Sequence, residues 1–361
     1  MTSIAPVIDC DGHVIEPDEV WPRFLPPQYR DRAPRRVRDE LGFERVLLEG
    51  KLHRRGAHPV GGGPRKKHLR PGASEPRPRL EDMDLEGIQS ALLFPTIAFI
   101  CFSSVSDPAF ATALCRAYND WIAAFCGENP DRLRAVALVP LHQDVHAAIE
   151  ELHRAVGSLG LRGVGLRPNA IGGRELSHES FEPFWTEIEK LGVPVCLHEG
   201  ASALVPAAGG DRFDNYLVRH LLSHPLEQMV ACTALVMGGV LERHPRMKVA
   251  FLESGAGWVP YLLDRMDEHV RIMGHLVAEN VKIKPSEYFK RQCFVACEAD
   301  EACLPAVIDL LGDDNIVFAS DYPHFNGTFP GAARPLREHP RLPEASIAKI
   351  LRENAARLLS R

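Results

Sequence analysis

A short apolar run near the start of the chain ends in two side chains that can bind a metal. The run is Val7-Ile8-Asp9-Cys10-Asp11-Gly12-His13. If it forms a β-strand, Asp11 and His13 project from the same face, because side chains two residues apart on a strand point the same way. These two residues would supply half of a metal site, so the other ligands must come from later in the chain.

Three later apolar runs also end in a residue that can bind a metal. They span residues 193–198, 248–253 and 315–321, and they end at His198, Glu253 and Asp321. This recurrence at strand ends predicts one site assembled from several strands. The set Asp11, His13, His198 and Asp321 offers oxygen and nitrogen ligands, which suit one divalent ion: zinc first, with manganese or iron as alternatives.

The order of apolar and helical segments predicts the fold. Strands should end near His13, Pro95, Pro140, Arg167, His198, Glu253, Cys297 and Asp321. Helical spacing is expected at 80–87, 107–126, 142–159, 181–191, 213–243, 258–281, 301–311 and 343–359. This alternation predicts an α/β protein, a single (β/α)8 barrel domain over residues 1–361, with its functional groups at the carboxyl ends of the strands. A doubly wound sheet is less favoured, because no glycine-rich phosphate turn follows the first strand.

Residues 14–80 interrupt this pattern. The segment is rich in proline, arginine and glycine and shows little periodicity. A long insertion of this kind is typical of a lid or an interface, so we expect it to cover part of the barrel mouth and to contribute to a homodimer or a larger homo-oligomer. Its basic residues between 51 and 79 also allow an alternative, a non-catalytic protein that binds an acidic partner.

Composition and charge narrow the class of protein. Hydrophobic residues make up 45% and charged residues 25% of the 361, which is typical of a soluble globular chain. The net charge of −6 argues against a nucleic-acid binder. Nine cysteines without CxxC pairs indicate reduced thiols. With neither a signal peptide nor an apolar run that could span a bilayer, we expect a cytoplasmic protein without a membrane partner.

Several other residues have both a functional and a structural interpretation. Arg167 could bind a substrate carboxylate or form a salt bridge. Glu16 could contact substrate or cap a loop, and His324 could steer Asp321 or face solvent. We keep Arg167, Glu16 and His324 as candidate substrate-binding residues. His220 and His224 lie four apart, on one helical face, but the glutamate of the metalloprotease pattern is missing, so we interpret them as loop or supporting residues.

Four segments resemble one known family. They are Ile8-Asp9-Cys10-Asp11-Gly12-His13, Val195-Cys196-Leu197-His198, Phe251-Leu252-Glu253-Ser254-Gly255-Ala256-Gly257-Trp258 and Ala319-Ser320-Asp321-Tyr322-Pro323-His324. They resemble the amidohydrolase-2 family, in the branch that includes decarboxylases of aminocarboxymuconate semialdehyde, γ-resorcylate and 5-carboxyvanillate. The resemblance implies that Asp11, His13, His198 and Asp321 bind one divalent metal, and that the substrate is a small carboxylated aromatic or muconate-like compound.

One departure from the family leaves two reactions open. The decarboxylases of the family place a histidine at the end of strand six, where this chain has Glu253. If burial near Trp258 keeps Glu253 protonated, it can donate a proton to carbon, as decarboxylation requires. If it lies near metal-activated water, it can act as a base in hydrolysis of a C–O or C–N bond. Asp321, Glu253 and His198 are therefore the candidate catalytic residues, with decarboxylation preferred over hydrolysis.

Overall fold

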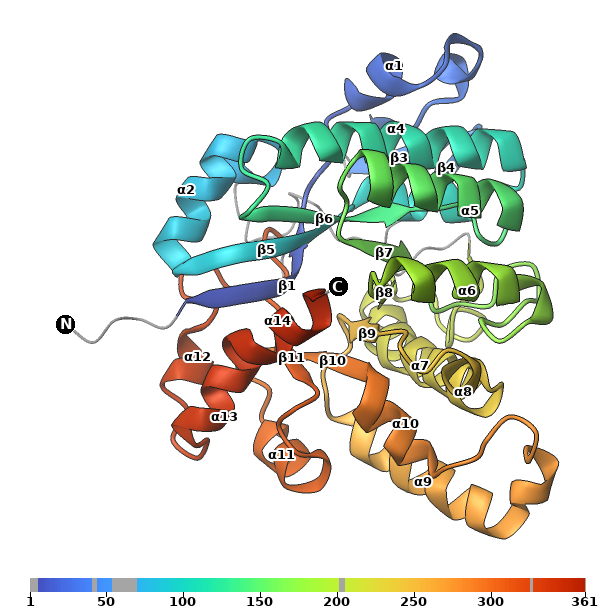
Figure 1. Ribbon diagram of the computed structural model, residues 1–361. Coiled ribbons are helices and arrows are strands. Elements are labelled where there is room, and N and C mark those ends of the chain that lie inside the picture. The colour runs from blue at the N-terminus through green and yellow to red at the C-terminus, as the bar shows by residue number, and fades with distance from the viewer. Residues whose placement is uncertain (1–5, 41–43, 54–69, 201–204, 325–326, 361) are drawn as a thin grey trace.

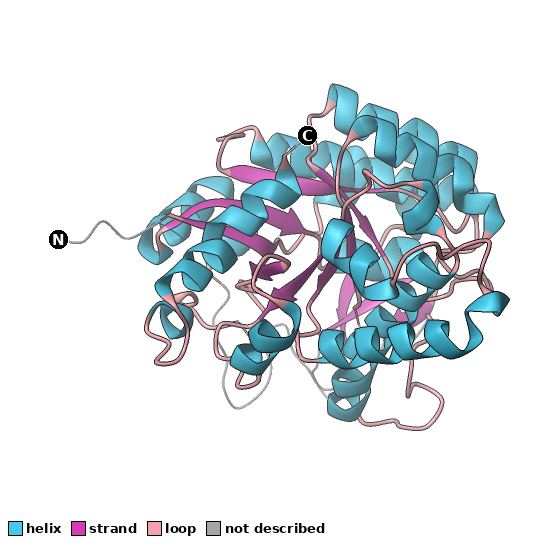
Figure 2. Ribbon diagram, turned by 60° about the horizontal axis from the view of Figure 1, so that its bottom comes forward, coloured by secondary structure: helices cyan, strands magenta, loops and turns pink. Residues whose placement is uncertain are grey.

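Eight parallel strands lie at the centre of the molecule and curve into a nearly closed barrel (Figure 1). The computed structural model describes residues 6–40, 44–53, 70–200, 205–324 and 327–360. In barrel order the strands are β1 (Val7–His13), β5 (Ile88–Phe94), β6 (Leu133–Leu138), β7 (Gly163–Leu166), β8 (Val195–His198), β9 (Val249–Leu252), β10 (Cys293–Cys297) and β11 (Ile316–Phe318). Helices surround these strands (Figure 2). The predicted (β/α)8 barrel is confirmed.

Helices follow the strands as predicted, although several boundaries differ. Those around the barrel are α2 (Pro76–Glu86), α3 (Ile97–Ser104), α4 (Pro108–Cys126), α5 (Val145–His153), α6 (Glu182–Leu191), α7 (Tyr216–Met237), α8 (Val240–Arg243), α9 (Trp258–Met273), α10 (Pro285–Gln292), α11 (Leu304–Leu311), α12 (Arg334–Arg337), α13 (Glu344–Ala348) and α14 (Asn354–Leu359). Short 3₁₀ segments occupy Pro27–Arg32, Pro71–Ala73, Glu179–Phe181 and Gly274–Leu276, and π-helical turns occupy Arg154–Ser158 and Lys349–Glu353.

Local sequence explains where helices begin and end. At the start of α4 the Asp107 side chain accepts hydrogen bonds from the backbone N–H groups of Ala109 and Phe110, which is the expected cap. The helical region predicted over 213–243 begins at Tyr216 and consists of two helices, because Gly239 adopts φ of 75° and divides it into α7 and α8. The helix predicted over 258–281 ends at Met273.

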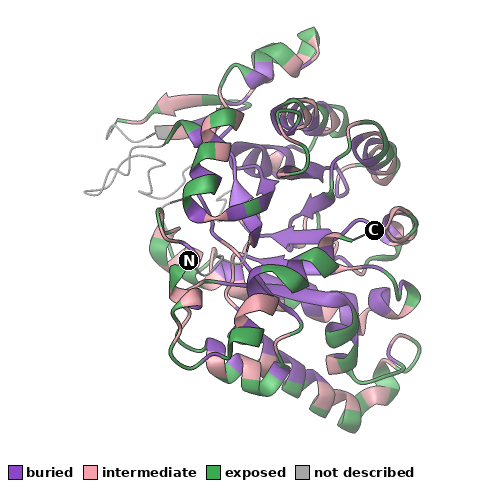
Figure 3. Ribbon diagram, turned by 60° about the vertical axis from the view of Figure 1, so that its left-hand side comes forward, coloured by how far each residue is buried: buried purple, intermediate pink, exposed green. Residues whose placement is uncertain are grey.

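The carboxyl ends of the strands lie level with one another. His13 pairs with Phe94, His198 with Leu252, and Cys297 with Phe318. Residues of β8 and β9 are buried along their whole length, as parallel strands covered on both sides require. Figure 3 shows the central strands of the molecule as buried. Residues at the ends of β1, β8 and β9 therefore meet at one end of the barrel.

The seam between the first and last strands is closed by the segment that follows β11. The backbone N–H of Asp321 donates to the Asp11 carbonyl at 2.9 Å, and the N–H of His13 donates to the Tyr322 carbonyl at 2.6 Å. The predicted last strand over 315–321 is wrong at its end, because β11 stops at Phe318 and Asp321 turns out of the extended conformation with φ of 48°. Asp321 is thus placed beside β1.

The insertion after β1 has more regular structure than its composition indicates. It contains α1 (Val20–Phe24) and an antiparallel sheet of β2 (Arg35–Arg38), β3 (Glu44–Leu48) and β4 (Lys51–His53). Val46 and Leu48 are buried, so alternate residues of β3 face inward, a period that the many charged residues hide in the sequence. Residues 54–69 lie outside the described residues. Among the described helices, none is both long and apolar enough to cross a membrane.

Candidate metal centre

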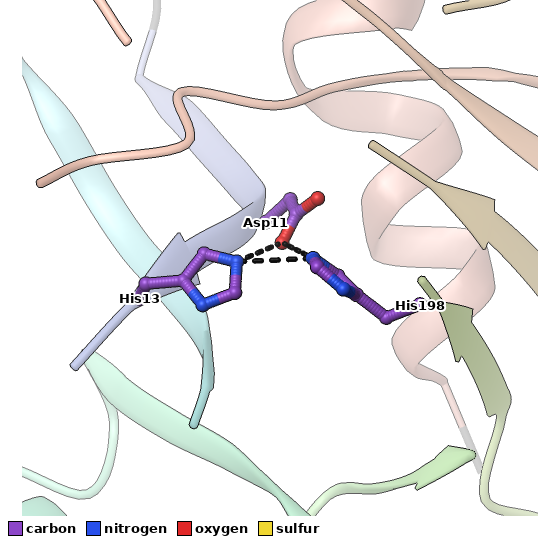
Figure 4. A group of neighbouring side chains, drawn as sticks. All are labelled: Asp11, His13 and His198. Atoms are coloured by element: carbon purple, nitrogen blue, oxygen red, sulfur yellow. Dashed lines mark hydrogen bonds and ion pairs between the residues drawn. The ribbon is translucent and has the colours of Figure 1, made fainter. Parts of the chain in front are cut away.

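Three predicted ligands converge at the carboxyl end of the barrel. Nε2 of His13 lies 3.0 Å from Nε2 of His198. Oδ1 of Asp11 lies 3.3 Å from the first of these nitrogens and 3.5 Å from the second. Figure 4 shows the three side chains, from β1 and β8, pointing toward one another. All three residues are at least 97% buried, because their exposed fractions are 0% for Asp11, 1% for His13 and 3% for His198.

The donor set fits a divalent cation. Nδ1 of His13 lies 3.1 Å from the Pro95 carbonyl oxygen, and Nδ1 of His198 lies 2.5 Å from the carbonyl oxygen of Glu199. In the neutral rings the proton therefore sits on Nδ1, and both Nε2 lone pairs face the same point. Neither carboxylate oxygen of Asp11 has a hydrogen-bond partner among the described residues. A buried carboxylate and two facing lone pairs suit an ion held between them.

Asp321 joins this group through His13. Its Oδ1 lies 3.5 Å from Nε2 of His13 and accepts a hydrogen bond from Nδ1 of His324 at 2.8 Å. Its Oδ2 is buried and has no hydrogen-bond partner among the described residues. The ring of His324 packs against that of His13, with centroids 4.1 Å apart. The structure thus places His324 in contact with both Asp321 and His13 and away from the solvent-facing alternative.

The ionisation of these groups reflects an excess of carboxylate. Burial would raise the pKa of Asp11, but His198 and His13 outweigh it and lower the pKa to about 2. Burial would lower the pKa of His198, but Asp11 and Glu253 raise it to about 9. Burial and the neighbouring Glu253 raise the pKa of Asp321 well above its usual value. The carboxyl groups of this buried site therefore cannot all ionise freely, because their negative charges repel one another. A bound cation would relieve that repulsion.

Glu253 lies among imidazoles. Its Oε2 is 3.2 Å from Nε2 of His198 and 3.5 Å from Nε2 of His224, and its Oε1 is 3.7 Å from Nε2 of His220. Burial would raise the pKa of Glu253, but His224, His220 and His198 lower it well below the usual value. Nε1 of Trp258 instead donates to Ser254. The structure therefore argues against a protonated Glu253 sheltered by Trp258.

A solvent-open hollow adjoins these residues. Five carboxylate residues line it: Asp11, Glu253, Glu298, Asp300 and Asp321. No lysine or arginine is among the described residues that line it. An anionic substrate would be repelled from this hollow unless a cation offset the carboxylates.

Arg167 follows β7 but already has three hydrogen-bond acceptors. Its guanidinium donates to Asn169 at 3.1 Å, to the Gly200 carbonyl at 2.9 Å and to Glu199 at 3.1 Å. The side chain is fully buried. The structure therefore favours the salt-bridge interpretation of Arg167 over contact with substrate.

Glu16 also has a structural position. It is fully buried and accepts backbone hydrogen bonds at the start of α3, from Ile97 and Ala98 at 2.9 Å each and from Thr96 at 3.3 Å. These donors are the unpaired N–H groups of a helix terminus. The arrangement favours the structural interpretation of Glu16, in which its carboxylate caps the backbone at the start of α3.

The sequence interpretation of His220 and His224 was incomplete. Both lie in α7, and their stacked rings, 3.9 Å apart, face Glu253. Their spacing of four residues predicts that they share one helix face, but it does not predict which residues that face packs against.

Comparison with known proteins gives the family. A family model described as amidohydrolase matches residues 8–361. The chain belongs to the amidohydrolase family. The resemblance noted in the four sequence segments is thereby confirmed, and it now extends over nearly the whole chain.

Relatives of this amidohydrolase include named decarboxylases. The 2-amino-3-carboxymuconate-6-semialdehyde decarboxylase of Dictyostelium discoideum is 28% identical over 249 residues, covering 69% of this chain and 67% of the relative. The gamma-resorcylate decarboxylase of Rhizobium sp. is 29% identical over 296 residues, covering 78% and 85%. The crystal structure of an amidohydrolase from Mycobacterium avium subsp. paratuberculosis aligns with a TM-score of 0.84 at 23% identity, over 99% of this chain and 100% of the other, which supports the fold.

Proposed function

We propose that this chain is a metal-dependent decarboxylase that removes CO₂, without oxidation, from a small carboxylated aromatic or muconate-like acid. The observation that carries the proposal is the buried group of Asp11, His13 and His198 at the edge of an acidic hollow. A carboxylated substrate needs a positive charge there. The decarboxylases among the relatives supply the reaction class.

The proposed ligands of the ion are Asp11, His13, His198 and Asp321. Their mixture of two imidazoles and two carboxylates suits zinc first, with manganese or iron as alternatives. A divalent ion bound there would hold an oxygen of the substrate and disperse the negative charge that develops as the carbon–carbon bond breaks. Glu199 and Pro95 keep the two imidazoles oriented, through the carbonyl contacts of His198 and His13.

Decarboxylation also requires a proton for carbon. The bonding electrons stay on the carbon that loses CO₂, and that carbon then takes up a proton. We assign the donor role to His324, because its Nδ1 is held by Asp321 at 2.8 Å and its ring lies beside His13. Its Nε2 lies 3.0 Å from the Thr96 hydroxyl, and it would exchange this contact for the substrate when it delivers the proton. Asp321 thus acts both as a ligand and as the residue that positions the donor. Arg167 and Glu16 support the walls of the site rather than contact the substrate.

Glu253 supports the alternative, hydrolysis of a C–O or C–N bond. An ionised carboxylate beside the ion could accept a proton from water, but it could not donate one to carbon. Glu253→Gln keeps the shape and removes the titration. Hydrolysis that depends on this base should fall by about 10²- to 10⁴-fold in the variant with metal content unchanged, whereas a loss of metal would make Glu253 a ligand.

The reaction can be tested directly by a substrate screen. The metal-loaded protein and a chelated control would be mixed with hydroxybenzoates, carboxymuconates and simple lactones, and CO₂ release would be scored separately from hydrolysis. The proposal expects metal-dependent CO₂ release from at least one acid. In the His324→Gln variant that release should fall by about 10²- to 10⁴-fold with metal content unchanged. Hydrolysis of a lactone without CO₂ from any acid would favour the alternative.

The non-catalytic alternative, in which basic residues between 51 and 79 bind an acidic partner, has less support than the enzyme. Of the described residues in this basic segment, Arg70 pairs with Asp82 at 2.6 Å, Arg77 pairs with Glu128 at 2.7 Å, and Arg79 is buried. Residues 54–69, which hold most of its positive charge, lie outside the described residues.

The quaternary structure and the cell compartment remain predictions. We expect segment 14–80 to serve as a lid and as part of a homo-oligomer interface, in a cytoplasmic protein. Sedimentation should give a dimer or a larger species, and a strictly monomeric protein would contradict the interface.

A further inference from the structure

The end of β10 supplies two carboxylates to the acidic hollow that the proposed reaction does not use. They are Glu298 and Asp300, which follow Cys297, the last residue of the strand. We propose that Glu298, together with Asp300, selects the substrate: a small acid with one carboxylate only, which carries an amino group at the end remote from the proposed metal ion. This inference rests on the proposed function and narrows it to one class of acid.

The position of β10 brings Glu298 to the same rim as the proposed site. In the barrel β10 lies between β9 and β11, and Cys297 pairs with Phe318 at the end of β11. Glu253 follows β9, and Asp321 follows β11. Glu253, Glu298 and Asp321 all line the hollow. A small molecule whose carboxylate is held at one end of the hollow can therefore meet Glu298 with its other end.

Glu298 and Asp300 are accessible to a ligand. Both are exposed, and in the part of the chain that the structure describes neither side chain forms an ion pair or a hydrogen bond. Glu301 shows the contrast, because its carboxylate accepts the backbone N–H groups of Ala256 at 2.9 Å and Gly257 at 2.8 Å and so holds the start of α9. The acid with a structural role is thus engaged, and the two that line the hollow are not.

Buried oxygens without partners indicate that the hollow receives a ligand. Oδ2 of Asp321 and both carboxylate oxygens of Asp11 are buried, and none of them has a hydrogen-bond partner among the described residues. Both residues line the hollow. The proposed ion would satisfy these oxygens at one end. Glu298 and Asp300 belong to none of the metal-binding groups found among the described residues, so at their end the ligand itself must bring the donors.

Charge determines which ligand suits this end of the hollow. Reduced hydration raises the pKa of Glu298, and the neighbouring Glu301, Asp300 and Glu253 raise it further, as expected for a carboxylate surrounded by negative charge. A second carboxylate on the substrate would add to this repulsion, and no lysine or arginine among the described lining residues would offset it. An amino group reverses the interaction, because its N–H groups donate to carboxylate oxygens.

The other lining residues carry no charge beyond the five carboxylates. Most of them are small, as Ala296, Ala299 and Ala332 are. Such side chains leave room for an apolar carbon framework and do not discriminate between charged substituents. Selection between an amine and a second carboxylate therefore depends on Glu298 and Asp300.

Paired probes test the proposal on the full chain loaded with manganese. Dissociation constants would be measured by calorimetry for meta- and para-(aminomethyl)benzoate and for isophthalate and terephthalate, which place an amine or a second carboxylate at matched ring positions. We expect the better amine to bind more tightly than the better dicarboxylate by about 10-fold or more. In Glu298→Gln, which keeps the size and removes the charge, this ratio should fall by about 10-fold with metal content unchanged.

A matched control separates Glu298 from the overall charge of the protein. Glu279→Gln removes an exposed carboxylate that does not line the hollow, and it should leave the ratio unchanged. Asp300→Asn should lower the ratio in the same direction as Glu298→Gln. Because all three positions are exposed, we expect the circular dichroism spectrum to be the same in each variant.

The outcomes distinguish this inference from the proposed function. Dicarboxylates that bind as tightly as the amines, a ratio that Glu298→Gln leaves unchanged, or no binding of either probe set would overturn the inference. CO₂ release from a dicarboxylate, with none from aminobenzoates, would also overturn it and would leave the proposed function standing. A preference for amines that depends on Glu298, without CO₂ from any acid, would support the selective role of Glu298 and contradict the proposed function.

Discussion

Asp9 accepts two hydrogen bonds from Ser320, a residue 311 positions later in the chain. The backbone N–H of Ser320 donates to Oδ1 at 3.0 Å, and its hydroxyl donates to Oδ2 at 2.6 Å. Asp9 and Asp11 are both on β1, and Ser320 immediately precedes Asp321. This one buried pair therefore joins the first strand to the segment that follows the last strand, and it places two proposed metal ligands, Asp11 and Asp321, side by side.

Removing Asp9 should weaken both the fold and the metal site. Asp9→Ala leaves the N–H and hydroxyl of Ser320 buried without this acceptor, so we expect the free energy of unfolding to fall by about 2 to 4 kcal/mol. Ser320→Ala is the comparison variant, because it keeps the backbone bond to Asp9 and removes the two bonds of the hydroxyl, which donates to Asp9 and accepts from the Tyr322 N–H at 3.1 Å; it should cost about 1 to 2 kcal/mol. Urea denaturation of both variants checks this. If Asp9→Ala is no less stable than Ser320→Ala, Asp9 does not have the proposed role of joining the first strand to the segment after the last.

Gly12 should resist any side chain, because the space beside β1 is filled. A Cβ there would lie 2.6 Å from Nη2 of Arg79 and 3.0 Å from Oδ2 of Asp9. Arg79 is itself buried and donates to the His13 carbonyl at 2.7 Å. Gly12→Ala should therefore cost about 1 to 3 kcal/mol of stability and lower metal affinity. Gly157→Ala, with nothing within 4 Å of its Cβ, should be nearly neutral in the same denaturation measurement.

The strand ends could be predicted because they are local features of the sequence. An apolar run that stops at Asp11, His13 or His198 marks both the strand and the ligand. What could not be predicted depends on packing between distant segments. The spacing of His220 and His224 places them on one helix face, but only the docking of α7 brings that face to Glu253. Arg167 could likewise be interpreted as a substrate contact from the sequence, because the order of residues does not show that Arg167 forms a buried ion pair with Glu199.

His142 should make stability depend on pH. Burial, and to a smaller extent Arg174 and Arg167, lower its pKa from 6.5 to about 4. Between these values the unfolded chain binds a proton that the folded chain does not. The stability contributed by neutral His142 is therefore complete above about pH 6.5 and is lost as the pH falls toward 4, by about 3 kcal/mol.

Replacing His142 removes this dependence. His142→Phe should fit, since the ring already packs edge-on against Phe181 with centroids 5.2 Å apart. Unfolding free energies measured from pH 7 to pH 4 should fall less steeply in the variant than in the unaltered protein. The exposed His146→Phe change should leave the slope as it is. If the unfolding free energies of His142→Phe and of the unaltered protein fall in parallel with pH, His142 does not have a lowered pKa in the folded protein.

Glu16 should matter for stability rather than for substrate affinity. In Glu16→Gln one carboxylate oxygen is replaced by an NH₂ group, which cannot accept from the α3 backbone, so we expect a loss of about 1 to 3 kcal/mol with KM nearly unchanged. Glu19→Gln, at an exposed position, is the control. Denaturation and steady-state kinetics together decide the point. A large rise in KM at unchanged stability would instead make Glu16 a substrate contact.

The most direct test measures metal content and CO₂ release on the same samples. Asp11→Asn, His13→Ala and Asp321→Asn would be compared with the unaltered protein, using the acid found in the substrate screen. Because these residues are proposed to hold one ion on which the reaction depends, metal content and CO₂ release should fall together and recover together when excess metal restores partial occupancy. CO₂ released at the full rate by metal-free protein, or full metal content in all three variants, would contradict the account.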